Sequence, residues 1–100
     1  MTPKDRLSHF QGYWLEIGHM LRREGYTGYV QDVMRYIQDS LLMGNGVFDT
    51  LDMVISTYDL PIEENTGDYW YFQERIAHIN QLLQDNSGPF IHNIKESKNG

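Results

Sequence analysis

The chain has 100 residues, of which 40% are hydrophobic and 22% are charged, and its formal net charge is −6 at pH 7. This length and composition predict one small domain with a single core and exclude a disordered or fibrous chain. Cysteine is absent, which excludes disulfides and thiolate chemistry, and no signal peptide or apolar run of about 20 residues is visible, so we expect a cytoplasmic protein.

The first two predicted elements are amphipathic helices. Apolar residues recur at spacings of three and four from Pro3 to Glu24, and Gly25 suits the position just after a helix end. The inward stripe of this helix is Leu7, Phe10, Trp14, Ile17 and Leu21. A second helix of about 15 residues is expected after Thr27, which can cap it, and the glycines at 44 and 46 break it. Its inward residues are Val30, Val33, Met34, Ile37 and Leu41.

Two further helices are expected in the second half of the chain. Asn45 can cap the third helix, which ends near Asp59 because the residue before Pro61 is pushed toward extended geometry. Its inward residues are Val47, Phe48, Leu51, Val54, Ile55 and Tyr58. The fourth helix begins between Thr66 and Asp68, and the breaker residues at 85–89 end it. Its inward residues are Tyr69, Phe72, Ile76, Ile79 and Leu83.

These elements predict an all-α fold, a compact bundle of about four amphipathic helices with short connections. We expect one domain over residues 1–100, with an ordered core at about 3–86 and a flexible tail at 87–100. The pattern does not determine the order of the helices in space.

The negative charge is concentrated in the middle of the sequence. Residues 36–74 contain eight acids and no lysine or arginine. Such a segment repels nucleic acid and anionic membrane, and it favours a basic protein as the partner. At about 100° per residue the acids of the third helix lie on its solvent side, and those of the following loop extend this surface if the loop stays close. The predicted contact acids are Asp49, Asp52, Asp59, Glu63, Glu64 and Asp68. A solvated helix face with no binding role would carry the same residues.

Two aromatic residues are candidate anchors beside these acids. Trp70 and Tyr71 point away from the inward stripe of the fourth helix, so we expect them to be partly exposed. Trp and Tyr give large contact areas and are enriched at binding hot spots. In the alternative interpretation, the segment at 60–65 folds back over Trp70 and covers it.

Enzymatic and metal-binding functions find little support in the sequence. Glu16 and His19, and likewise Glu74 and His78, have the spacing of metal ligands on a helix, but both pairs are predicted to face water rather than the bundle interior. The glycines near Asn45 follow a helix and lack the full spacing of a phosphate-binding loop. A third helix with outward acids would be repelled by DNA phosphates. We therefore predict no catalytic residue, no metal, no cofactor and no enzyme activity.

The sequence resembles a known class of bacterial proteins. An acidic, all-helical chain of this length, without cysteine and centred on VMRYIQDSLLMGNGVFDTLDMVIS, is similar to the small immunity proteins of contact-dependent growth inhibition and related polymorphic toxin systems. The resemblance spans residues 5–86 and carries no catalytic motif. It implies a protein that binds a cognate toxin domain, often a nuclease, and blocks its active site or substrate groove. The alternative is an acidic regulatory or adaptor module of another bacterial system, including a phage-encoded inhibitor.

Overall fold

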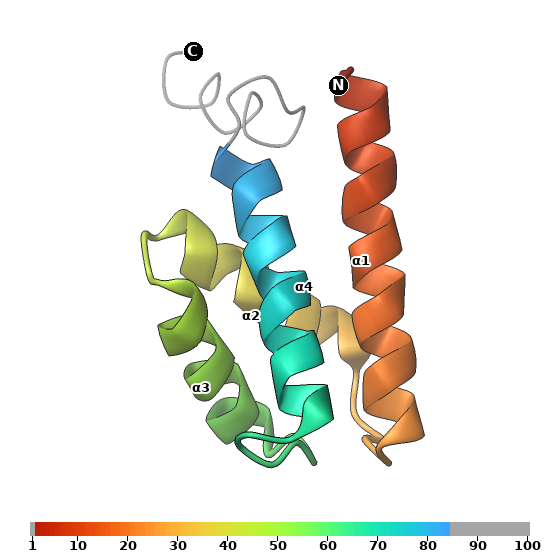
Figure 1. The fold of residues 1–100 in the computed structure, drawn as a ribbon, viewed down its shortest axis with the longest axis vertical. Coiled ribbons are helices and arrows are strands. Elements are labelled where there is room, and N and C mark those ends of the chain that lie inside the picture. The colour runs from red at the N-terminus through yellow and green to blue at the C-terminus, as the bar shows by residue number, and fades with distance from the viewer. Residues whose placement is uncertain (1, 85–100) are drawn as a thin grey trace.

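The structure is a computed structural model that describes residues 2–84, and this part of the chain contains helices and no strand. The helices are α1 (Pro3–Arg23), α2 (Val30–Leu42), α3 (Val47–Tyr58) and α4 (Gly67–Gln84) (Figure 1). The predicted all-α fold class is confirmed. The expected helix end at 85–89 and the tail at 87–100 lie outside the described residues.

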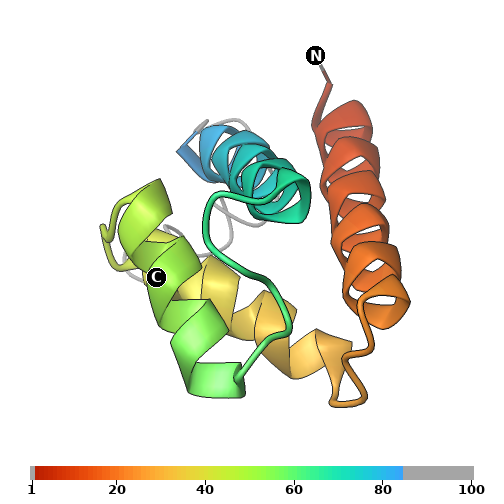
Figure 2. The same ribbon diagram turned by 60° about the horizontal axis from the view of Figure 1, so that its bottom comes forward.

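Helix α4 is the centre of the bundle, because its packing against the other three helices is the most extensive of the four. Helices α1 and α4 run side by side in opposite directions, and α2 crosses behind α4 (Figure 1). The turn at 43–46 joins α2 to α3, which pack against each other. The connection at 59–66 then crosses from the end of α3 to the start of α4 (Figure 2). This crossing brings the loop acids close to α4.

Two of the four helices begin with a side-chain cap. The backbone N–H of Asp5 donates to Thr2 Oγ1 at 3.1 Å, and the N–H of Tyr69 donates to Thr66 Oγ1 at 3.2 Å. Each threonine thereby satisfies one of the backbone donors that a helix start leaves open. The start of α4 between Thr66 and Asp68 is confirmed.

The predicted caps of α2 and α3 are wrong. Helix α2 starts after Tyr29 rather than after Thr27, because the connection first turns back and the N–H of Tyr26 donates to the carbonyl of Leu21 at 2.9 Å. Helix α3 starts after Gly46, and neither helix has a side-chain cap. The Asn45 amide instead donates to Ser40 Oγ at 3.1 Å. Asn45 therefore ties the turn to the end of α2.

Helix α3 ends at Tyr58 with Asp59 as its C-terminal cap, which confirms the predicted end near Asp59. Asp59 has left-handed backbone angles, φ 50° and ψ 51°, and its N–H donates to the carbonyl of Ile55. Glycine is the usual residue in this conformation, although aspartate tolerates it better than most. The carboxylate also lies at the negative end of the helix dipole, which is unfavourable by about 0.3–1 kcal/mol.

The core contains most of the residues that the helical spacing placed inward. Phe72, Leu51, Val54, Ile37 and Ile76 are among those with no exposed surface. The connection at 59–66 adds Leu60 and Ile62, which are also buried. The packing of this connection onto the helices explains how a segment with so many acids stays close to the bundle.

Two residues predicted to be inward are exposed, and five others, Trp14, Val30, Val47, Ile55 and Tyr58, are only partly buried. Leu7 is 39% exposed and Phe48 is 49% exposed, so both predictions are wrong. Leu7 lies at the edge of the stripe of α1, in the turns that α2 does not reach. Phe48 is displaced because α3 turns its Thr50 side inward, where the Thr50 hydroxyl hydrogen bonds with Ser40 at 2.8 Å in the core. This rotation of α3 places Phe48 on the surface of the protein.

Candidate protein-binding surface

The acids singled out in the sequence lie on the surface of the protein. Asp49, Asp52 and Asp59 on α3 are exposed, as are Glu63 and Glu64 in the connection to α4. Within residues 2–84, an ion pair with Lys, Arg or His is found for none of these five. Their charges therefore face solvent, and no cation of the described residues neutralises them.

Asp68 differs from the other acids. Its side chain is 25% exposed, and Arg23 of α1 donates to its Oδ1 at 2.6 Å. A short charge-assisted bond of this kind fixes both groups. Asp68 thus joins the start of α4 to the end of α1, and its charge is largely satisfied within the protein.

Asp52 and Glu64 meet at the phenol of Tyr69, although they come from different elements. Tyr69 is buried, and its hydroxyl donates to Asp52 Oδ1 at 3.2 Å. Burial raises the pKa of the Tyr69 phenol, and the neighbouring Asp52 and Glu64 carboxylates raise this pKa further. The connection at 59–66 therefore does stay close to α3 at this point.

This environment predicts a loss of stability in alkali. The folded protein keeps the Tyr69 proton above pH 10, where the phenol of the unfolded chain ionises, so the free energy of unfolding falls as the pH rises beyond about 10. Substitution Tyr69→Phe should make this fall shallower. Urea unfolding at several values between pH 9 and 11.5 measures both slopes. Equal slopes in the two proteins would contradict the role of Tyr69.

Trp70 follows Tyr69 and lies next to the acidic site formed by Asp52 and Glu64. Its side chain is 47% exposed, which confirms the predicted exposure. The alternative, in which the segment at 60–65 covers Trp70, is wrong because Leu60 and Ile62 of that segment enter the core. The Trp70 ring packs edge-on against Phe48, with the ring centroids 6.2 Å apart. Phe48 and Trp70, here called the aromatic pair, join the surfaces of α3 and α4.

The sequence pattern missed Phe48 as a surface residue. Counting only apolar residues places the inward side of α3 near Leu51, with Phe48 close to it. The residues that are buried also include Thr50, which shifts the inward direction so that Phe48 points about 110° away from it. Thr50 carries no hydrophobic signal in the sequence. Only its buried hydrogen bond with Ser40 reveals this rotation of α3.

Tyr71, the second predicted anchor, contacts Arg75 of the same helix. It is half buried, and the guanidinium carbon of Arg75 lies 4.8 Å from its ring centroid. Arg75 also lies 5.6 Å from the ring of Tyr13 on α1. The guanidinium donates to Glu16 at 2.9 Å and to Glu74 at 3.2 Å. Tyr71 therefore belongs to a contact that holds α1 against α4.

The same contact includes members of both Glu–His pairs that have metal-ligand spacing. Glu16 and Glu74 both bind Arg75, while His19 is exposed. His78 is half buried with its ring centroid 5.1 Å from that of Tyr13, so the prediction that it faces water is wrong. Across residues 2–84, no three His, Cys, Asp or Glu side chains are arranged to hold a metal ion.

A second acidic site lies around a hollow of about 450 Å³ beside the start of α4. Glu24, Glu63 and Asp68 contribute carboxylates to its wall. A side-chain hydrogen bond with Asp68 raises the pKa of the Glu24 carboxyl, burial adds to this rise, and the charge of Arg23 opposes it. This site is thus partly neutralised, in contrast to the acids of α3.

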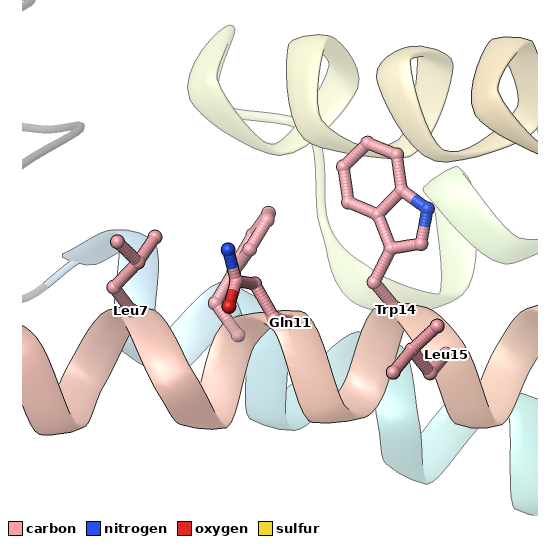
Figure 3. A pocket seen from close by; sticks show the side chains of 5 residues that line it. Leu7, Gln11, Trp14 and Leu15 are labelled. Carbon is pink, nitrogen blue, oxygen red and sulfur yellow. The ribbon is translucent and has the colours of Figure 1, made fainter.

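A further hollow of about 430 Å³ lies along α1 and is mainly apolar. Leu7, Gln11 and Trp14 project from one side of the helix here, with Leu15 beside them (Figure 3). Phe10 completes the wall. No charged side chain lines it, so it is separate from the acidic surface.

The surface of α3 and α4 thus combines unpaired carboxylates with exposed aromatic rings, a composition suited to protein binding. None of the helices in the described part of the chain combines the length and the apolar character that crossing a membrane requires. Comparison with protein-family models, curated proteins and solved structures finds no match to this chain.

Proposed function

We propose that this protein is an immunity protein, which binds a basic toxin domain in the cytoplasm and blocks its active site or substrate groove. The observation that supports this function most directly is the group of exposed, unpaired carboxylates on α3 and the α3–α4 connection, at Asp49, Asp52, Asp59, Glu63 and Glu64. The resemblance of the sequence to immunity proteins points to the same function.

Electrostatics gives this surface a mechanism. A nuclease presents a positively charged groove to the phosphates of its substrate, and a row of carboxylates can occupy such a groove in their place. Unpaired charges accelerate the encounter of two proteins by long-range attraction, and salt screens this attraction over about 10 Å at 0.1 M. The exposed aromatic pair would supply contact area that the charged side chains lack.

Co-expression with the product of the gene immediately upstream tests the proposal. We expect a tagged form of this protein to recover a basic domain that is toxic when expressed alone. Recovery of a non-toxic regulator, such as a sigma factor or a kinase, would contradict immunity and favour the adaptor function.

The role of the acids is tested with the recovered partner. Replacing Asp49, Asp52 and Asp59 by Asn should lower the association rate constant and flatten its salt dependence, while dissociation changes less. Surface plasmon resonance at 20 to 300 mM salt measures both rate constants. The matched control replaces Asp5, Asp32 and Asp39, which are exposed on α1 and α2, and changes the net charge by the same amount. Equal effects of the two triple substitutions on the association rate constant would mean that only the net charge of the protein matters, and not the position of the acids on α3.

A further inference from the structure

The protein contains one arginine that shows how its own surface chemistry binds a guanidinium group. Arg75 is 18% exposed, its guanidinium lies over the rings of Tyr13 and Tyr71, and it donates to the carboxylates of Glu16 and Glu74. Aromatic faces attract the cation, while carboxylates accept its hydrogen bonds. Two rings and two acids are therefore sufficient to hold an arginine between α1 and α4.

The same set of groups recurs on the surface between α3 and α4. Phe48 and Trp70 expose about half of their surface each, and their rings lie 6.2 Å apart. Asp49 is the next residue after Phe48, and Asp52 follows one helical turn later on the same side of α3. The phenol of Tyr69, whose ring is 5.1 Å from that of Trp70, orients the Asp52 carboxylate at 3.2 Å.

This second set lacks a cation of its own. The chain has no lysine or arginine from Tyr36 to Glu74, and Arg23 and Arg75 bind other acids. Within residues 2–84 no ion pair is found for Asp49 or Asp52, so the aromatic pair and its neighbouring carboxylates are complementary to a positive charge on another molecule.

We propose that the aromatic pair, with Asp49 and Asp52, is a receptor for an arginine side chain of the basic partner. This inference rests on the proposed function and specifies how that partner is recognised. Arginine fits better than lysine because its guanidinium is planar, stacks on aromatic rings and is weakly hydrated, whereas the lysine ammonium is compact and strongly hydrated. The partner's arginine takes the place that Arg75 occupies in the internal contact.

The test uses two short peptides of equal charge. One contains three arginines separated by glycine and serine, and the other contains three lysines at the same positions. Each is titrated into the full-length protein while the indole N–H signals of Trp70 and Trp14 are followed by NMR. We expect the arginine peptide to shift the Trp70 signal and to bind about two- to fivefold more tightly than the lysine peptide, the range of one exposed cation–π contact. The Trp14 signal, from the far helix α1, should not move.

Variants locate the site. Trp70→Ala and Phe48→Ala should each reduce the ratio of the arginine-peptide affinity to the lysine-peptide affinity toward one. The indole signal of Trp70 reports on Phe48→Ala, and the backbone amide signals of Asp49 and Asp52 report on Trp70→Ala. Both side chains are half exposed, so the fold should survive, and circular dichroism checks this. Tyr29→Ala is the matched control, because it removes an aromatic ring that is 74% exposed on another part of the surface. It should leave the preference unchanged.

Three results would overturn the receptor. These are equal affinity for the two peptides, an arginine preference that survives Trp70→Ala, and shifts confined to the second acidic site at Glu24, Glu63 and Asp68. Any of them is compatible with a partner that still depends on the acids of α3, since the triple Asn substitution tests that separately. The receptor and the proposed function can therefore fail independently.

Discussion

Substitution Phe72→Ala is expected to lower the free energy of unfolding by about 3–5 kcal/mol. Phe72 has no exposed surface and lies on α4, the helix with the most extensive packing against the others, so a smaller side chain leaves a cavity that no single helix can move to fill. For a domain of this size, each kcal/mol lowers the midpoint of thermal unfolding by about 4–8 °C. Differential scanning calorimetry would measure the change.

The control for Phe72→Ala lies two residues earlier on the same helix. Trp70→Ala removes an even larger ring, but from the surface, so its effect on stability should be much smaller. Since both variants introduce alanine into α4, the comparison separates core packing from helix propensity. A small effect of Phe72→Ala would contradict the central position of α4.

Substitution Arg75→Ala is expected to lower the free energy of unfolding by about 1–3 kcal/mol. The Arg75 side chain is mostly buried and its guanidinium contacts the rings of Tyr13 and Tyr71, and a desolvated cation–π contact contributes about 2 kcal/mol or more. The aliphatic part of the side chain also packs, and its loss adds to the effect. Urea unfolding would measure the change.

Arg75→Lys separates charge from shape. Lysine keeps the positive charge but lacks the planar group that contacts two rings and two carboxylates together. We expect it to restore only part of the lost stability. Full stability in Arg75→Lys would mean that charge alone holds α1 against α4. Amide hydrogen exchange adds a second measurement, since α1 should lose protection more than α3 in both variants.

The fold was predictable because the apolar spacing of each helix is regular and the breakers between helices are strong. The stripes of α1, α2 and α4 identified most of the buried residues, including Ile17, Ile37 and Ile76. Errors arose where a polar residue enters the core. Buried Thr50, bound to Ser40, turned α3 and left Phe48 on the surface, and hydrophobic periodicity contains no information about such a pair.

The candidate site was predictable only in part. The position of the acids in the sequence was sufficient to place Asp49, Asp52 and Asp59 on the solvent side of α3. The contacts between elements were not accessible, because they depend on the arrangement of the helices in space. Pairing of Asp68 with Arg23 and stacking of Arg75 on Tyr13 join α4 to α1, whose residues are distant in the sequence. These contacts separate the acids and aromatics used within the fold from those left open.

The backbone conformation of Asp59 implies a trade-off between folding and binding. Its left-handed geometry favours glycine, and its charge opposes the dipole of α3, so a search for more stable variants would select Asp59→Gly early. That variant would also remove one of the unpaired charges that, under the proposed function, attract the partner. Selection for thermal tolerance and selection for rapid capture of a toxin would therefore act in opposite directions at this one residue.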